Sequence, residues 1–303
     1  MMSRLALRSL LLCSMTGAAI AGCSGPAGET CSVDEDCASH FCKADGTCGA
    51  APVDGSMTTG DGGIDAPSGV CAPNHDGQVS LGELPLIAGR SATFRVAMGA
   101  SWSTAGTSNP NGTHTWNLAG TLSGDADHVI PLGNPDGTWW RTDYPNATYT
   151  APLASDSDLL GVFKVDSTGV TLLAVVSPDG GASKTELDYD PPAKILSVPF
   201  GAGSTWTSTS TVSGYAQGLI VAYTEKYESR ADLVGDMTTP YGTFPVIRIA
   251  TDLTRTSGLQ LLLTKRTFAW MAECFGSVAT AQSQDFESSA EFSDDAEVRR
   301  LVQ

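Results

Sequence analysis

The sequence predicts an all-β protein, an antiparallel meander that forms a curved sheet, half-barrel or sandwich. Turn signals of the type x-Pro-Asp/Asn-Gly recur at residues 109–112, 134–137 and 177–180. Runs rich in threonine, valine and aromatic residues lie between these turns and read as strands. The periodicity of amphipathic helices is nearly absent before the acidic C-terminal segment.

The first 22 residues read as a signal peptide, because Arg4 and Arg8 precede a short apolar stretch. That stretch is shorter than the about 20 apolar residues that a membrane-spanning helix needs. It ends in Ile20-Ala21-Gly22-Cys23, which resembles the lipobox of bacterial lipoproteins. The resemblance implies that the chain is cleaved before Cys23 and acylated there, so that residues 23–30 form a lipidated N-terminus. The alternative is an ordinary signal peptide cut near Ala21.

The same resemblance implies a subcellular location. In the best-known sorting rule of Gram-negative bacteria, Asp after the lipidated cysteine retains a lipoprotein in the inner membrane, and this chain has Ser24. We therefore expect an outer-membrane lipoprotein of the cell envelope, facing the periplasm or the cell surface. Its partner would be the lipid bilayer, through acylated Cys23. The net charge of −16, without a cluster of Lys and Arg, argues against nucleic acid as a partner.

The chain has eight cysteines, and an exported chain is expected to pair those that remain after Cys13 leaves with the signal peptide and Cys23 takes lipid. Six remain, which predicts disulfides among Cys31, Cys37, Cys42, Cys48, Cys71 and Cys274. Residues 31–48 bury too little apolar surface to fold without cross-links, so two disulfides are expected there. A zinc site with His40 is the alternative, disfavoured because the segment has no Cys-x2-Cys pair. The segment resembles short Cys-rich modules of bacterial surface lipoproteins. Cys71 and Cys274 are left for each other.

Residues 49–70 read as a flexible linker, and residues 71–89 as an EF-hand-like loop or a turn. The resemblance to an EF-hand rests on Asn74, Asp76, the backbone of Gln78, and Glu83, at the third, fifth, seventh and twelfth loop positions. It implies a weak calcium site. The first position is Ala72 instead of Asp, which favours the alternative, a type I turn at residues 74–77 that leads into the first strand.

Residues 90–285 are expected to form the β-rich domain, followed by an acidic tail at residues 286–303. The clearest predicted strands form sequential hairpins and cover residues 160–165, 170–176, 219–231, 244–254, 259–271 and 275–282. Residues 195–284 are similar to a pattern of uncharacterised exported bacterial β domains, with a Pro-x-Gly-Thr turn and an aromatic strand. That resemblance implies a twisted antiparallel sheet, such as the half-barrels of lipoprotein carriers, and no catalytic residues.

No familiar catalytic motif occurs in the sequence. His114 and His128 are the only candidate bases in the β domain, and a hydrolase would pair His128 with a nearby aspartate. Trp270 is expected in the core. Trp139 and Trp140 are candidate ligand contacts, because adjacent strand residues face opposite sides of a sheet.

These observations favour a membrane-anchored surface lipoprotein with a non-catalytic, β-rich binding or envelope-structural domain. No cofactor is expected beyond a weak calcium ion. The alternative is a carrier of lipid or another apolar ligand in a curved sheet, and the third hypothesis is a hydrolase without familiar motifs.

Overall fold

A computed structural model describes residues 71–302, and this part of the chain is nearly all β. One short 3₁₀ helix, η2 (Leu81–Glu83), accompanies sixteen strands. The strands are β1 (Gln78–Val79), β2 (Ser91–Met98), β3 (Thr107–Ser108), β4 (His114–Asn117), β5 (Ala126–Pro131), β6 (Tyr149–Pro152), β7 (Leu160–Asp166), β8 (Gly169–Val176), β9 (Glu186–Ser197), β10 (Phe200–Gly201), β11 (Thr205–Ala216), β12 (Leu219–Thr238), β13 (Thr243–Ser257), β14 (Gln260–Ala272), β15 (Gly276–Ser283) and β16 (Asp295–Leu301).

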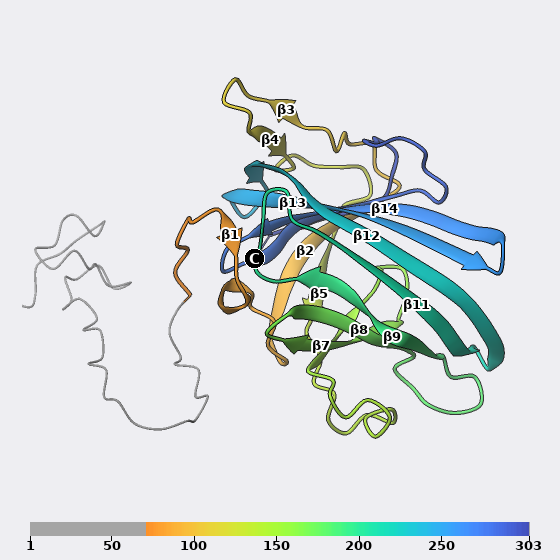
Figure 1. Cartoon of the computed structure of the whole chain (residues 1–303). Helices are drawn as coiled ribbons and strands as arrows, with labels where there is room; N and C mark the ends of the chain where they lie inside the picture. Colours follow the sequence, from red (N-terminus) through yellow and green to blue (C-terminus); the bar gives the residue numbers. More distant parts are fainter. Residues whose placement is uncertain (1–70, 303) are drawn as a thin grey trace, which may run out of the picture. The chain divides into compact units, whose positions relative to one another are not determined.

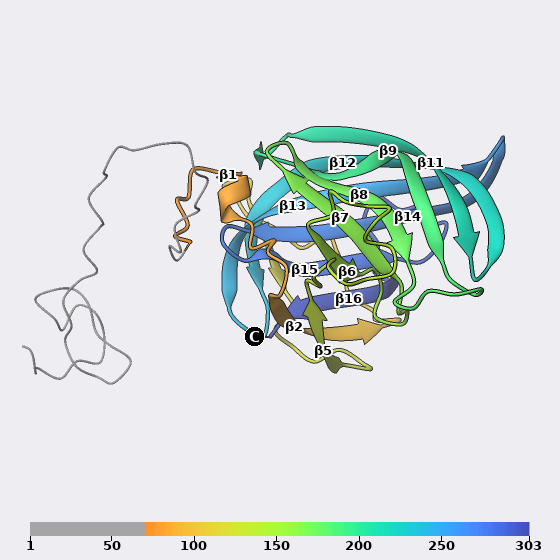
Figure 2. The same cartoon turned by 90° about the horizontal axis from the view of Figure 1, so that it is seen from below.

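Fourteen strands form a single, almost closed, barrel-like sheet, with the order β5-β2-β16-β15-β14-β13-β12-β11-β9-β8-β7-β6 along its main path (Figure 1). The two edge strands approach each other, because Gly133, just after β5, forms an antiparallel bridge with Thr150 on β6. The curvature is visible in Figure 2, where the sheet wraps around its interior. The predicted antiparallel, curved, all-β architecture is confirmed.

The predicted hairpins are present: β7 and β8 form one, and β12 to β15 follow one another as a meander. β12 continues to Thr238, beyond the predicted end at residue 231, and β11, which was not predicted, precedes it in the same meander. The turn between β11 and β12 shows why the sequence folds locally in this way. Gln217 and Gly218 both have positive φ, 52° and 77°, as the two central residues of a tight type I′ turn require.

The C-terminal segment departs from the prediction. Residues 286–303 were expected to be an acidic tail, but β16 lies inside the sheet, between β15 and β2. Val298 and Arg300 are fully buried there. The prediction was wrong because the charged residues of this segment were taken as solvent-exposed, whereas Asp295, Glu297 and Arg300 are buried in the sheet. The domain also begins earlier than residue 90, since β1 pairs with β10 and Val79 is 1% exposed.

Both faces of the central strands are buried, so the protein has more than one core. Side chains on the concave face, such as Ile247, Ile249 and Trp206, form the main interior cluster. On the convex face, Trp116, Phe268 and Trp270 belong to a second cluster beneath β3, β4 and neighbouring loops. Trp270 is fully buried, as expected. The parallel strand β4 lies so close to β12 that a Cβ on Gly235 would stand 1.7 Å from the carbonyl oxygen of His114, so this position requires glycine.

Candidate functional site

An apolar pocket lies on the concave face, where the two edge strands of the sheet approach each other. We call it the seam pocket. Its volume is about 430 Å³, and it opens beside the segment that follows η2. The apolar side chains that line it are Pro85, Leu86, Ala92, Phe94, Ile130, Leu132, Ala151, Pro152, Tyr241, Phe275 and Leu301.

Strand register explains why these residues meet. Arg299 on β16 stands opposite Thr280 on β15 and Val96 on β2, so the three side chains share one face. Thr280 in turn stands opposite Ala269, which packs against the interior cluster. The seam pocket is therefore on the inside of the barrel-like sheet, and the intervening Val298 points to the convex face.

Two arginines bring positive charge to this otherwise apolar lining. Arg299 is occupied, since its Nε donates to Glu297 Oε1 at 2.5 Å and its Nη2 to the carbonyl oxygen of Leu153 at 3.3 Å. Arg90 is exposed. Its guanidinium forms no hydrogen bond or ion pair with any residue in the range 71–302, whereas every other arginine in that range does. An unpaired guanidinium beside an apolar pocket is suited to a carboxylate or phosphate group of a ligand.

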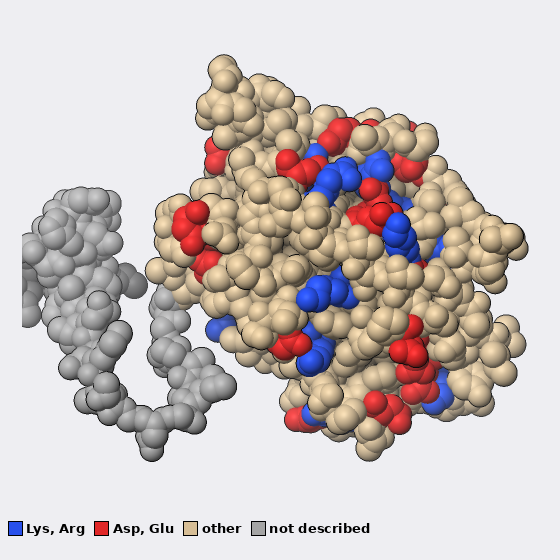
Figure 3. Space-filling model, in the orientation of Figure 1, with Lys and Arg blue, Asp and Glu red and all other residues tan. Residues whose placement is uncertain are grey.

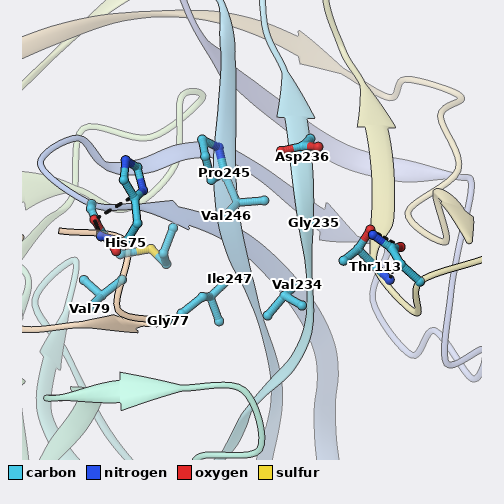
Figure 4. Close-up of a pocket in the computed structure, with 13 residues that line it drawn as sticks. His75, Gly77, Val79, Thr113, Val234, Gly235, Asp236, Pro245, Val246 and Ile247 are labelled. Atoms are coloured by element: carbon cyan, nitrogen blue, oxygen red, sulfur yellow. Dashed lines mark hydrogen bonds and ion pairs between the residues drawn. The ribbon is translucent and has the colours of Figure 1, made fainter. Parts of the chain in front are cut away.

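A second hollow, of about 330 Å³, lies between the loop that precedes β1 and strands β12 and β13 (Figure 4). His75 and Thr113 stand on its opposite sides, with Val234, Gly235 and Asp236 along one wall. The backbone N–H of His75 donates to Glu273 Oε2 at 3.0 Å, which fixes the loop. The hydrogen bond between His75 and Glu273 lies within the chain and holds the loop in place, and we assign no ligand to this hollow.

The interior of the sheet contains a buried ion pair. Glu225 is fully buried, and Arg255 donates to its Oε1 through Nε at 2.8 Å. The hydroxyls of Tyr189 and Tyr227 donate to Oε2 of the same carboxylate at 2.9 and 2.6 Å. Burial, and then the nearby negative charge, raises the pKa of both tyrosines above the usual value. Because every group has a partner, this cluster is structural and offers no free acid or base.

The EF-hand-like residues are not arranged as a set of ligands. The Glu83 carboxylate turns back to Ser80 and accepts from both its N–H and its hydroxyl at 2.7 Å. Asn74 Oδ1 and Asp76 Oδ1 accept the N–H groups of Asp76 and Gln78. Within residues 71–302, no three His, Cys, Asp or Glu side chains are grouped closely enough to hold a metal ion. The predicted type I turn is also wrong, because His75 has a φ of +54°.

Trp139 and Trp140 are not on a strand, so the strand alternation on which their prediction as ligand contacts rested is wrong. Trp140 is 1% exposed and packs in a small third cluster beneath the loop that follows β5. Trp139 is half-buried, its indole N–H donates to the carbonyl oxygen of Ser177 at 3.2 Å, and Lys184 lies over its ring. A loop conformation, not strand alternation, gives the two side chains their different environments.

The two candidate bases are not part of a catalytic triad. His114 Nε2 lies 3.0 Å from Ser108 Oγ, but its buried Nδ1 has no partner among the described residues, so no carboxylate orients the ring. Near His128, Asp127 is bound to Arg95 at 2.7 Å, and the pKa of this carboxyl is lowered by that bond. The other nearby acid, Asp125, is bound to Arg300 at 2.5 Å.

The structure contains the disulfide between Cys71 and Cys274, which ties the start of the domain to the turn between β14 and β15. The other cysteine assignments, Cys23, Cys31, Cys37, Cys42 and Cys48, lie outside the described residues. So do the signal peptide, the Cys-rich module and the linker. No helix in the described part of the chain is long and apolar enough to span a bilayer.

Comparison with known proteins gives no match: no family model matches the chain, and neither a curated protein nor a solved structure is similar to it. Any assignment of function therefore rests on the residues themselves. Sequence reasoning missed the seam pocket, because its lining comes from short strands that only the register of the closed sheet brings together.

Proposed function

We propose that this chain is a non-catalytic binding protein of the cell envelope whose β domain holds a small apolar or amphipathic ligand in the seam pocket. The observation that carries the proposal is the pocket itself: about 430 Å³, lined mainly by apolar side chains, on the concave face of an almost closed sheet. Sites for small ligands have volumes of about 300–1,000 Å³ and a mostly apolar lining with few polar groups.

The chemistry of the lining favours binding over catalysis. Burial of apolar ligand surface drives association by about 25 cal/mol per Å². The polar groups of side chains at the pocket are the hydroxyls of Ser91, Ser277, Thr280 and Tyr241 and the guanidinium groups of the two arginines. This set can orient a ligand by hydrogen bonds, and it has neither a carboxylate nor an imidazole to move a proton.

The attachment to a membrane is part of the same proposal and is supported only by the sequence. Ile20-Ala21-Gly22-Cys23 supplies the lipidation motif, and 47 residues, 24–70, separate that cysteine from the described residues. Mass spectrometry tests the anchor: the mature chain should carry acyl groups, and a Cys23→Ala variant should not. Equal masses, apart from the substitution, would contradict the anchor and leave the pocket proposal untouched.

Ligand binding is tested with a variant that fills the pocket. We expect the purified chain to carry extractable apolar molecules and, after delipidation, to bind an apolar fluorescent probe saturably. Ala92→Phe should reduce probe binding at least tenfold, because the added ring occupies the cavity. Ala119→Phe, in an exposed loop outside the pocket, is the matched control and should bind as the parent does. Absence of saturable binding by the folded parent would contradict the proposal.

A further inference from the structure

Two hairpins carry exposed apolar side chains at the end of the sheet that lies away from the Cys71–Cys274 disulfide. One tip is the turn between β11 and β12, and the other is the turn between β13 and β14; together we call them the apolar tips. Leu259 is fully exposed, Ile220 is 82% and Leu219 is 72% exposed. The other large exposed apolar side chains at this end are Tyr215, Leu261, Leu262 and Phe286.

The tips are free of charge in a strongly acidic chain. Residues 215–224 and 256–264 contain no Asp, Glu, Lys, Arg or His, although the net charge of the chain is −16. In Figure 3 the ends of these hairpins, at the right of the molecule, show neither acidic nor basic colour, whereas charged groups gather over the middle of the sheet. A hairpin turn in water usually carries polar residues, so apolar, uncharged tips indicate a contact surface.

The β13–β14 tip projects beyond its neighbour β15, whereas the β11–β12 tip is flanked by the loop before β9, since the N–H of Gly218 donates to the carbonyl oxygen of Lys184 at 3.0 Å. β14 pairs with β15 only from Thr267 onward, so residues 260–266 extend past that strand. Pairing of β12 with β13 stops at Thr224 and Thr256, and the two hairpin ends stand apart beyond this point (Figures 1 and 2). The backbone N–H of Phe286 donates to Thr264 at 2.8 Å and adds one more exposed ring to the same end.

Charges nearest the tips are balanced. Lys226 pairs with Glu228 at 2.8 Å and Lys265 with Asp285 at 2.9 Å. Arg255 pairs with the buried Glu225, and Lys184 with Glu186. This end is therefore close to neutral, and the excess of negative charge lies elsewhere on the chain. An anionic membrane surface would repel the acidic regions but not this end.

We propose that the apolar tips insert into a lipid bilayer. The apolar side chains of the two tips can enter the boundary between head groups and acyl chains, where apolar burial is favourable, and residues 215–224 and 256–264 bring no charge with them. Tyr215, opposite Ile220 in the β11–β12 ladder, is suited to the interface because its ring is amphipathic. A surface of this kind binds by apolar burial, so binding should depend little on salt and should occur on both zwitterionic and anionic vesicles.

Vesicle flotation of the full chain with Cys23→Ser tests the tips without an acyl anchor. The probes are phosphatidylcholine vesicles and phosphatidylethanolamine–phosphatidylglycerol vesicles. We expect the parent to float with both kinds, at low and high salt. Ile220→Asn/Leu259→Asn should reduce partitioning at least tenfold. The control, Met98→Asn/Val129→Asn, replaces two exposed apolar side chains on β2 and β5, away from the tips, that are 44% and 63% exposed, and should partition as the parent does.

Three results would overturn the proposal. The folded parent could remain with the soluble fraction on both vesicle types, or the tip variant could bind as well as the parent. The third is a parent that dimerises without lipid and a tip variant that is monomeric, which would assign the tips to a second copy. A Leu259→Trp variant adds a direct readout: its difference fluorescence should shift to the blue with vesicles, and an unchanged spectrum would also contradict insertion. None of these readouts depends on the seam pocket.

Discussion

The guanidinium of Arg248 on β13 donates to both carboxylate oxygens of Glu291, with Nη1 2.9 Å from Oε2 and Nη2 2.7 Å from Oε1. The same guanidinium binds both oxygens of Asp232 and the carbonyl oxygen of Thr104. Its side chain is 1% exposed and lies over the ring of Phe268. One buried cation therefore holds the loop between β15 and β16 against the convex face of the sheet.

Arg248→Met should destabilise the domain strongly, because it leaves Asp232 and Glu291 without their buried cation. Removal of one partner of a buried pair costs about 3–5 kcal/mol. Arg230→Met is the control, since Arg230 is 44% exposed and its ion pairs to Asp232 and Asp252 are long, at 3.9 and 3.5 Å. That change should cost about 1 kcal/mol or less. Denaturant unfolding measures both, and equal losses would contradict the role of Arg248.

The Cys71–Cys274 disulfide closes a loop with a sequence separation of 203 residues. In the chain-entropy model, a loop of this length corresponds to about 5 kcal/mol of stabilisation, and removal of a native disulfide typically costs about 2–5 kcal/mol. We expect a Cys71→Ser/Cys274→Ser variant to unfold at a lower denaturant concentration by an amount in that range. The parent under reducing conditions should lose a similar amount from this domain. An unchanged midpoint in the variant would contradict the prediction.

Asp295 at the start of β16 should make stability depend on pH. Burial raises its pKa to about 7, partly opposed by the hydrogen bond from the N–H of Trp102, while the neighbouring Asp294 raises it further. Between about pH 4 and pH 7, the folded state keeps a proton that the unfolded state has released, so the free energy of unfolding falls as pH rises. The slope should approach about 1 kcal/mol per pH unit and flatten above pH 7.

Asp295→Asn removes this titration, so the variant should lose that slope and gain stability over the parent at pH 8. Asp294→Asn, at an exposed neighbouring position, should keep the slope. Chemical unfolding at a series of pH values measures all three proteins. A parental slope that survives in Asp295→Asn would mean that other groups titrate.

Arg90 should select ligands that carry an anionic group. Its guanidinium has no partner within the described part of the chain and lies at the seam pocket. We expect Arg90→Gln to weaken binding of a long-chain carboxylate about tenfold or more, as loss of a charge-assisted hydrogen bond does. Binding of the corresponding neutral alcohol should be unchanged. Parallel titrations with the two ligands measure the difference, and an equal loss for both would contradict selection by charge.

The sequence predicted those parts of the fold that depend on local signals. The hairpin of residues 160–176 and the meander from residue 219 to 283 were recognisable, because each strand meets the next across a short turn. The pairing of β16 with β2 was not recognisable in the sequence. The paired residues are about 200 residues apart, and no local pattern encodes which distant strand completes a sheet.

The candidate site shows the same limit. Ala92, Ile130 and Ala151 are unremarkable apolar residues in short strands, and they line one pocket only after the sheet has curved until β5 and β6 meet. Trp139 and Trp140 stood out in the sequence, but tight packing against Ser177 and the third cluster gives them a structural role. The residues that stand out in the sequence, Trp139 and Trp140, are therefore not those that line the seam pocket.

The place of β16 between β15 and β2 has a consequence for biosynthesis. β2 is among the first strands to leave the ribosome, yet one of its two neighbours is made only when translation reaches residue 301. The nascent β2 must wait with an open edge until then, and such edges are prone to misassembly.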